Sequence, residues 1–262
     1  MREMHTHHGK REDRVGGQDL KQGIYEVTYN EKIAKDIYKM ILTGDTAPIS
    51  APGQFVNIKL DGFFLRRPIS VCRYDERSIT IVYKVVGGGT EYMSTLSAGA
   101  RLDMLTGLGN GFDTKKSGDS PVVIGGGVGA PPLLGLAEAL IKEGKKVTAV
   151  LGFNTRDDVC LACEFASLGA NVMITTVDGS VGTKGFVTDA LHDLDYSYFY
   201  TCGPLPMLKA VYACTKTDGE FSFEERMGCG FGACMGCSCK TKYGYKRICR
   251  DGPVLEKGEI VW

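Results

Sequence analysis

Five of the ten cysteines in this sequence lie in one short segment near its end. Cys229, Cys234 and Cys237 follow the spacing C-x4-C-x2-C, and Cys249 comes after eleven intervening residues. Three thiolates in a tight loop with a fourth at a distance form the ligand pattern of plant-type 2Fe-2S clusters. The glycines between them let the backbone wrap closely and point its amides at sulfur. The segment therefore predicts a 2Fe-2S cluster held by these four cysteines.

Two alternatives concern the same thiols. A structural zinc ion also accepts four thiolates, although zinc modules usually take them from two C-x2-C-like pairs. Cys239 lies two residues beyond Cys237, and along an extended chain both side chains point to the same face. We interpret Cys239 as a spare thiol, with a role as a ligand as the alternative.

A second candidate site is a glycine-rich turn between a buried strand and a helix. Residues 122–132 read VVIGGGVGAPP, and Gly126, Gly127 and Gly129 would let backbone amides meet a pyrophosphate at the helix N-terminus. This pattern predicts a dinucleotide site, and a close-packed structural turn is the alternative interpretation.

A second strand end and one acidic residue extend this prediction. Cys202, Gly203 and Pro204 form another turn of small residues after a strand, and ligands of parallel sheets bind beyond the carboxyl ends of strands. We expect this turn to face the nicotinamide. Asp178 follows the third strand of the region, where a carboxylate repels the 2'-phosphate of NADP. We therefore expect NAD, with Arg156 as the argument against it.

A third candidate site lies earlier in the chain, in the string FLRRPISVCRYD. Arg67 offers a forked cation, Pro68 fixes the backbone and Ser70 offers a hydroxyl, a combination suited to a diphosphate. Gly89 and Thr90 could bring amides to the same phosphates. Taken alone, this string is more often an ordinary charged strand edge.

The elements that must position these residues fall into three regions. Residues 21–118 consist of short alternating runs with β-branched residues and regular turns, which predicts a small antiparallel β-barrel or sandwich. Residues 119–221 alternate strand and helix patterns, which predicts a parallel α/β nucleotide-binding domain. Residues 222–262 form a small cysteine-rich module. Residues 1–20 are polar and predict a flexible extension. The expected fold class is α+β, with several domains.

The composition excludes several classes of function. Lys and Arg together number 31, as do Asp and Glu, so nothing predicts a surface for nucleic acid or anionic membranes. No apolar run is long enough for a membrane span, and the N-terminus has no signal core. Ten cysteines without an export signal predict reduced thiols and a cytoplasmic protein.

The three sites in this order resemble those of a known family. The run Arg67-Pro68-Ile69-Ser70 resembles the flavin-binding motif of the ferredoxin reductase family. Its pyridine nucleotide motifs resemble Gly126-Gly127-Val128-Gly129 and Cys202-Gly203-Pro204. The string MGCGFGACMGC after the nucleotide region narrows the resemblance to electron transfer subunits of type B dihydroorotate dehydrogenases. The resemblance covers residues 20–262, and the sequence departs from the family pattern at two places. Pro131 stands where relatives usually carry a smaller or less rigid residue, and the cysteine-rich loop before Cys249 is short.

The resemblance implies FAD on the barrel, NAD on the parallel sheet and a 2Fe-2S cluster on the four cysteines. It implies that Val82, Tyr83 and Lys84 line the flavin and that Gly89 and Thr90 contact its phosphates. Hydride exchange between nicotinamide and flavin needs alignment and exclusion of water, so we expect no catalytic side chain.

The resemblance also implies a partner. This would be an FMN-containing subunit that oxidises dihydroorotate to orotate, with two copies of each subunit in a heterotetramer. Electrons would pass from FMN through the cluster to FAD and NAD. Two other functions stay open: a flavin and iron-sulfur reductase subunit serving ferredoxin, a hydrogenase or a sulfur-reducing partner, and a non-enzymatic zinc-stabilised binding module.

Overall fold

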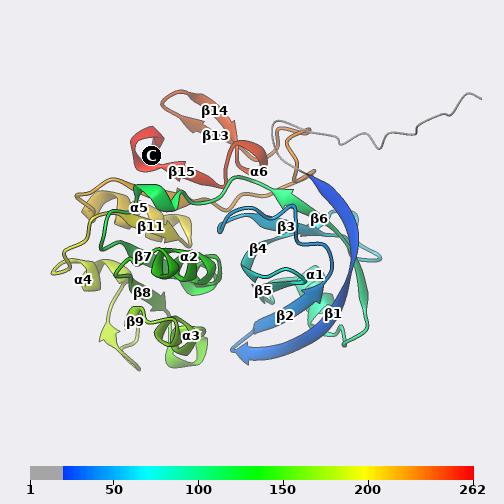
Figure 1. The fold of residues 1–262 in the computed structure, drawn as a ribbon, viewed down its shortest axis with the longest axis horizontal. Coiled ribbons are helices and arrows are strands. Elements are labelled where there is room, and N and C mark those ends of the chain that lie inside the picture. Colours follow the sequence, from blue (N-terminus) through cyan, green and yellow to red (C-terminus); the bar gives the residue numbers. More distant parts are fainter. Residues whose placement is uncertain (1–19) are drawn as a thin grey trace, which may run out of the picture.

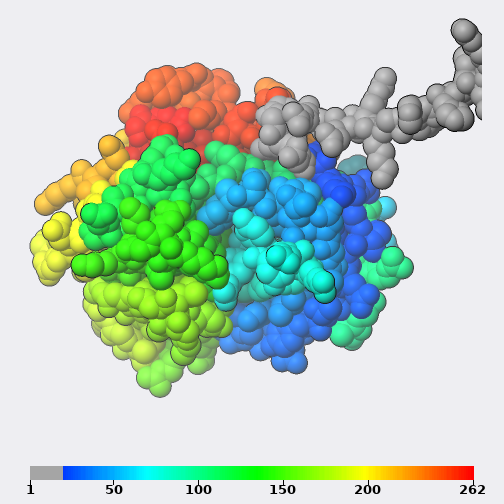
Figure 2. Space-filling model, in the orientation of Figure 1, coloured from blue at the N-terminus to red at the C-terminus, as the bar shows by residue number. Residues whose placement is uncertain are grey.

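The computed structural model describes residues 20–262, so the predicted extension over residues 1–20 lies outside the described part except for its last residue. Figure 1 shows a barrel and an α/β sheet side by side, with the C-terminal segment lying across one end of both. The same segment, coloured orange to red in Figure 2, forms a cap on the surface. The cysteine-rich segment thus lies against the rest of the protein.

The first sheet is a closed antiparallel barrel with the strand order β1-β2-β5-β4-β3-β6. Its strands are β1 (Lys21–Ala34), β2 (Ile37–Thr43), β3 (Phe55–Ile58), β4 (Arg67–Tyr74), β5 (Ser78–Lys84) and β6 (Arg101–Leu108). The helix α1 (Gly88–Ser94) follows β5, and the short turn η1 (Thr114–Lys116) follows β6.

The barrel forms because apolar residues alternate along its strands. Tyr25 and Val27 on β1, and Ile79 and Ile81 on β5, are buried in one core inside the barrel. Residues two apart on a strand share a face, so this period sends every second side chain inward. Strand β3 is buried on both faces, because its outer face is covered by the rest of the protein.

The second sheet has seven strands in the order β10-β9-β8-β7-β11-β12-β15. Its strands are β7 (Val122–Gly126), β8 (Thr148–Phe153), β9 (Asn171–Thr176), β10 (Thr183–Lys184), β11 (Phe199–Cys202), β12 (Gly219–Ser222) and β15 (Val254–Glu256). The helices and 3-10 turns between them are η2 (Gly127–Gly129), α2 (Ala130–Lys142), η3 (Arg156–Asp158), α3 (Ala162–Ser167), α4 (Val187–Leu191) and α5 (Leu205–Cys214). All its pairings are parallel except that of β12 with β15.

Helix α2 fixes the nucleotide sheet against the barrel strand β4. A Cβ atom at Gly135 would lie 2.6 Å from the carbonyl oxygen of Cys72, so only glycine permits this approach of helix to strand. The Nε atom of Arg73 donates a hydrogen bond of 2.7 Å to the carboxylate of Glu138. The strand that carries the predicted flavin motif is therefore anchored to the nucleotide domain.

The C-terminal segment consists of a hairpin, a short helix and a returning strand. Its elements besides β15 are β13 (Ser238–Thr241), β14 (Gly244–Arg247), α6 (Ile248–Asp251) and η4 (Lys257–Glu259). The side chain of Asn110, after β6, donates to the carbonyl of Val254 at 2.8 Å and accepts from its amide at 2.9 Å. The segment thus bonds to the barrel side as well as to the nucleotide sheet.

The predicted fold class is confirmed, and the choice between barrel and sandwich is resolved as a closed barrel. The predicted domain boundaries stay predictions. Strand β15 completes the nucleotide sheet although it comes from the cysteine-rich region, so the two regions share one sheet. Within residues 20–262, no helix has the length and apolar character needed to cross a membrane.

Candidate functional site

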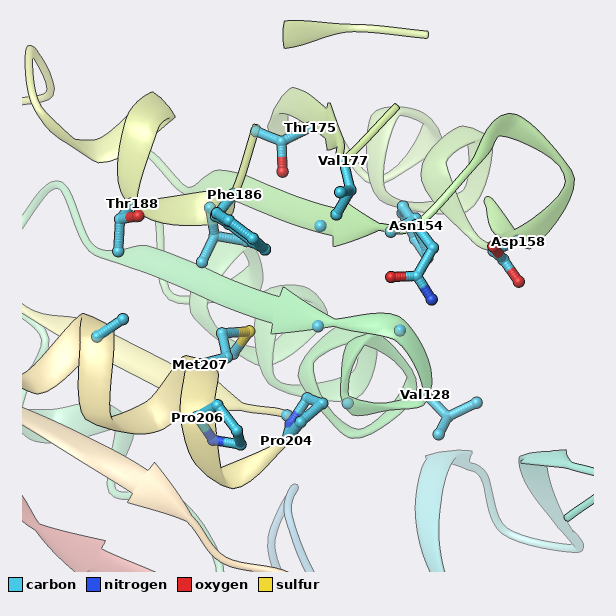
Figure 3. A pocket seen from close by; sticks show the side chains of 18 of the residues that line it. Val128, Asn154, Asp158, Thr175, Val177, Phe186, Thr188, Pro204, Pro206 and Met207 are labelled. Atoms are coloured by element: carbon cyan, nitrogen blue, oxygen red, sulfur yellow. The ribbon is translucent and has the colours of Figure 1, made fainter. Parts of the chain in front are cut away.

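A cavity of about 540 Å³ opens at the carboxyl ends of the nucleotide strands. Figure 3 shows Asn154 beyond β8, Val177 beyond β9, and Pro204 and Met207 beyond β11, all directed toward it. The predicted residues that line this cavity are Gly126, Gly127, Gly129, Gly203 and Pro204. The structure thus brings the two predicted nucleotide turns together at one cavity.

The glycines are required by close packing and by backbone conformation. A Cβ atom at Gly129 would lie 2.2 Å from the carbonyl oxygen of Cys202, so the start of α2 lies directly on the end of β11. Gly127 has a φ of +53° and open space where a side chain would be. Its amide therefore borders free volume, as a pyrophosphate site requires.

Two buried side chains near the cavity, Thr175 and Cys202, differ in their access to it. The Thr175 side chain is fully buried, lines the cavity and has no hydrogen-bond partner for its hydroxyl within residues 20–262. This hydroxyl is available to a ligand. Cys202 is 1% exposed and does not line the cavity, and burial raises the pKa of its thiol. The sulfur of Cys202 therefore lies beneath the turn instead of facing the nicotinamide.

The cavity is lined by all three regions of the chain. Lys84 and Ile37 come from barrel strands, and Glu224 comes from the segment that leads into the cysteine loop. Solvent reaches Glu224 through the cavity, but surrounding atoms remove part of its hydration, which raises the pKa of its carboxyl. The nucleotide cavity therefore borders the barrel and the segment that precedes the cysteine loop.

Asp178 lies outside this cavity, although its neighbour Val177 lines it. The Asp178 carboxylate accepts hydrogen bonds from the hydroxyl and amide of Ser180, at 2.7 and 2.9 Å, and these lower its pKa. Arg156 donates from its guanidinium to the carbonyl of Ser180 at 2.8 Å. Asp178, predicted to favour NAD, and Arg156, the argument against NAD, thus both bond Ser180 at the rim beyond β9.

The predicted flavin strand carries a guanidinium packed against a helix start. A Cβ atom at Gly89 would lie 2.1 Å from Nε of Arg67, so glycine lets the guanidinium lie on the first turn of α1. Arg67 also lies over the ring of Phe63, at 4.7 Å from its centroid. The hydroxyl of Thr90 accepts from the amides of Val86 and Gly87 and donates to the carbonyl of Gly87, so it caps the helix.

The strand register separates the flavin residues onto two faces. Phe55 pairs with Ser70 and Asn57 with Pro68, so these four side chains share the outer face of the barrel. Ile69 points the other way and packs on the barrel core.

The same alternation divides the three predicted flavin residues of β5. Tyr83 is 2% exposed, packs in the barrel core and donates its hydroxyl to Asn30 at 2.9 Å. Val82 packs with the core beneath α2, and Lys84 reaches the nucleotide cavity. Tyr83 therefore offers its backbone, and not its side chain, to the outer face.

The four predicted cluster cysteines lie together as two pairs. The amide of Cys229 donates to the sulfur of Cys234 at 3.5 Å, and the amide of Cys249 donates to the sulfur of Cys237 at 3.4 Å. Cys249 also interacts electrostatically with Cys229, which joins the two pairs. A 2Fe-2S cluster takes two thiolates on each iron, so the pairing fits this group.

Backbone amides point at sulfur, as the glycine content predicts. The amides of Ala233 and Cys234 donate to the sulfur of Cys229 at 3.2 and 3.4 Å. Burial alone would raise the pKa of Cys229, but hydrogen bonds from the loop lower it to about 7. Burial, together with the nearby Cys237, raises the pKa of Cys249 to about 12.

Cys239 lies on the hairpin strand β13, where it pairs with Lys246. Burial raises the pKa of its thiol, with smaller contributions from Glu225 and the nearby Cys237. Within residues 20–262, its sulfur makes no hydrogen bond to the four predicted ligands. In that part of the chain, no three His, Cys, Asp or Glu side chains lie close enough together to hold a single metal ion. The interpretation of Cys239 as a spare thiol stays a prediction.

Sequence reasoning missed several residues at the cavity. Asn154 and Asp158 follow β8, Phe186 and Thr188 flank the start of α4, and Glu224 follows β12. Most of them come just after a parallel strand, which is the signal that could have found them. Glu224 also follows a parallel strand, β12, but whether it reaches the cavity depends on the path of the chain after that strand, which tertiary packing sets.

Comparison with protein families identifies two segments. Residues 224–261 match the family model described as the iron-sulfur cluster binding domain of dihydroorotate dehydrogenase B. Residues 123–213 match the oxidoreductase NAD-binding domain. These matches confirm the predictions of an iron-sulfur cluster and of NAD, and they set the zinc alternative aside.

Complete relatives resemble the chain over nearly its whole length. It is 44% identical over 256 residues to the dihydroorotate dehydrogenase B (NAD(+)) electron transfer subunit of Geobacillus sp. (strain WCH70), covering 92% of this chain and 99% of the relative. It is also 44% identical over 252 residues to the subunit of the same name from Fusobacterium nucleatum subsp. nucleatum, covering 89% and 96%.

Solved structures show the same architecture. The structure described as an NADH-dependent reduced ferredoxin-NADP oxidoreductase, studied for flavin-based electron bifurcation, superposes with a TM-score of 0.84 at 29% identity, covering 92% of this chain and 90% of that one. The ferredoxin reductase of carbazole 1,9a-dioxygenase shares the fold, with a TM-score of 0.65 at 23% identity over 76% of this chain and 68% of that one. Both neighbours confirm the predicted fold, and the first, which is described by flavin-based electron bifurcation, supports the prediction of FAD.

Proposed function

The chain belongs to the family of electron transfer subunits of NAD-dependent dihydroorotate dehydrogenase B, and from this premise we propose that it carries electrons from a dihydroorotate-oxidising subunit to NAD. One observation of the structure supports this most directly. A single cavity borders the nucleotide turns, the barrel strand that ends at Lys84 and the segment that leads into the cysteine loop. Hydride exchange and single-electron transfer can therefore meet at one place.

When bound, FAD exchanges hydride with nicotinamide and single electrons with the 2Fe-2S cluster. Each region of the chain then has one binding task. Arg67 supplies a forked cation for the flavin diphosphate, with Gly89 leaving room for it. The turns at Gly126 and Gly203 present backbone amides to NAD and keep side chains out of its path.

The side of the proposed cluster that faces the partner can be inferred from the exposure of its ligands. These would be Cys229, Cys234, Cys237 and Cys249. Cys234 is exposed, whereas Cys237 and Cys249 are buried against the rest of the protein. One thiol pair therefore reaches the surface while the other packs toward the flavin barrel. This arrangement supports an outlet from the flavin to a second protein.

We propose NAD over NADP because the Asp178 carboxylate is held ionised at the rim beyond β9 by Ser180. An ionised carboxylate there repels the additional phosphate of NADP. We further propose a heterotetramer of two copies of each subunit, with an FMN-containing catalytic partner, in the cytoplasm. The names of the relatives support a catalytic partner.

The decisive experiment is purification of this chain together with the candidate FMN-containing subunit, followed by an assay of dihydroorotate-dependent NAD reduction. We expect flavin and iron-sulfur absorption in the complex, and NADH formation that needs both subunits. The same preparation tests the rival prediction of a ferredoxin-linked reductase. NADH-dependent reduction of ferredoxin without any dihydroorotate activity of the complex would overturn the proposal.

A further inference from the structure

The barrel touches the cysteine loop through one buried amide. Asn57 on β3 is 1% exposed, and its Nδ2 atom donates a hydrogen bond of 3.2 Å to the carbonyl of Cys229, 172 residues away in the chain. The loop is built to receive this amide. Gly230 has a φ of +80°, and a Cβ atom there would lie 2.2 Å from Nδ2 of Asn57. Any side chain at this position would displace the contact.

The same amide lies beside the predicted flavin motif. Asn57 pairs directly with Pro68 on β4, and Phe55 pairs with Ser70. Because paired residues of antiparallel strands point to the same face, the amide shares the outer face of the barrel with Pro68 and Ser70. Phe55, its neighbour on this face, packs in one core with Cys237 and Cys249. Asn57 therefore stands between the flavin strand and the cluster cysteines.

The other half of the carboxamide has no partner. The Oδ1 atom of Asn57 is buried and accepts no hydrogen bond from any of residues 20–262. The backbone carbonyl of Asn57 is bonded by the Arg66 guanidinium at 3.3 Å, so only the side-chain oxygen is left without a donor. Buried polar atoms are nearly always bonded, so a buried acceptor left without a donor calls for an explanation, which a bound ligand or a water molecule can supply. The oxidised isoalloxazine ring has such a donor in its imide N–H.

We propose that the Asn57 carboxamide is a positioning residue that joins the flavin to the cluster: its Nδ2 fixes the Cys229 carbonyl, and its Oδ1 accepts the imide N–H of the isoalloxazine. The inference rests on the proposed function and deepens it. In the proposed function, the reduced cluster loses one electron and the flavin gains it. Reduction by NADH drives the reverse transfer, and in neither direction does a bond to Asn57 form or break. Asn57 acts by holding the two groups at a fixed separation.

The test uses the full chain with FAD and cluster bound, under anaerobic conditions. Asn57→Leu removes both hydrogen bonds and keeps the branched shape of the side chain, and Asn57→Asp keeps an acceptor oxygen while it removes the donor. Asn110→Leu is the matched control, because Asn110 also joins the barrel side to the C-terminal segment but bonds Val254 instead of the cluster loop.

Rapid mixing with NADH separates two steps by absorbance. We expect Asn57→Leu to leave flavin reduction by NADH unchanged and to slow the following cluster reduction about tenfold. The loss of one buried hydrogen bond lowers by about this factor the fraction of molecules in which flavin and cluster are placed for electron transfer. The control should keep both rates.

Two further measurements do not depend on turnover. In FAD titrations, Asn57→Leu should weaken binding about tenfold, whereas Asn57→Asp should stay within about threefold of the wild type because it keeps the acceptor. The electron paramagnetic resonance spectrum of the dithionite-reduced cluster should shift in both Asn57 variants, since the Cys229 backbone is released, and not in Asn110→Leu.

The inference would be overturned if Asn57→Leu had the same rate of cluster reduction, the same affinity for FAD and the same spectrum as the wild type. If Asn57→Leu fails to retain its cofactors, Asn57→Asp tests the inference in its place. The measurements are again the rate of cluster reduction, the affinity for FAD and the spectrum of the reduced cluster. Failure of the wild type to pass electrons from NADH to its cluster would count against the proposed function itself. The titration and the spectrum would still report on Asn57 in that case, so the two failures are distinguishable.

Discussion

The cysteine loop and the nucleotide cavity hold their ligands by opposite means. In the proposed cluster site, four side chains of one type supply the ligands, three of them within nine residues, and the backbone only tunes them. The cavity uses the ends of several strands, where glycine leaves open space, as at Gly127, or lets a neighbouring side chain pack closely, as Met207 does at Gly203. One site depends on what its side chains are, and the other depends on where its backbone lies.

This difference determines how each site should respond to substitution. A thiolate ligand is removed by a single exchange of sulfur for oxygen. A backbone amide cannot be removed in this way, and a substitution acts on it only by displacing the chain. We therefore expect the largest effects at the cysteines and smaller, graded effects at the cavity.

The sharpest test of the comparison is Cys234→Ser beside Cys239→Ser. Loss of a residue that supports a metal ligand typically lowers metal affinity roughly 10- to 100-fold. Cys234→Ser removes a proposed ligand itself, so it should lower cluster occupancy by more than this. Cys239→Ser should retain the cluster, because Cys239 lies outside the two thiol pairs. Iron and acid-labile sulfide per FAD measure both variants. Loss of the cluster in Cys239→Ser would show that the ligand set is wrong.

The cavity is tested by Gly129→Ala against Gly127→Ala. The new methyl at position 129 would meet the carbonyl of Cys202 at 2.2 Å, and we expect about 1–3 kcal/mol of destabilisation with a raised KM for NADH. At Gly127 there is open space, so only the positive φ costs free energy, about 1–2 kcal/mol. Thermal unfolding and NADH kinetics compare them. Equal KM values in both variants would contradict the packing argument.

The loop amides are tested through the acidity of Cys229. Because the pKa of its thiol is lowered to about 7, its thiolate should form as the pH rises through 7, below the range of an ordinary cysteine. In protein stripped of iron, alkylation of Cys229 by iodoacetamide, followed by mass spectrometry, should be half-maximal near this pH and severalfold faster at pH 7 than alkylation of the exposed Cys163. A midpoint near that of a free thiol would refute the role of the amides.

The smallest effect is expected at the rim of the cavity. Asp178→Ala should narrow the gap in KM between NADH and NADPH about fivefold, since one exposed charge contributes about 1 kcal/mol at most. Asp157→Ala removes another exposed carboxylate, next to Arg156 in η3, and serves as the control. An unchanged ratio in Asp178→Ala, or the same change in both variants, would remove the argument for NAD specificity.

Several features could be predicted from the sequence because their causes are local. The spacing of Cys229, Cys234 and Cys237 specifies a ligand loop within a few residues, and the structure brings Cys249 to it as predicted. The six alternating runs of the barrel and the strand-helix alternation after Ser120 fixed the fold class, since each strand's period decides which side chains are buried.

Other features depended on the tertiary structure, because they arise where distant segments meet. Tyr83 was grouped with Val82 and Lys84 along the chain, but the closed barrel places its side chain in the interior core. The turn at Cys202, Gly203 and Pro204 was read along the chain as one unit, but in the structure Gly203 and Pro204 line the cavity while the side chain of Cys202 is buried.

The sequence by itself determined which ligand chemistry this protein can offer, because residue types and short spacings are properties of the chain. Only the tertiary structure decided how the sites connect. The bond from Asn57 to Cys229 and the position of Glu224 at the cavity join segments that no local pattern relates. Such contacts are set by the packing of whole sheets and helices, and the relative placement of flavin, nucleotide and cluster follows from that packing.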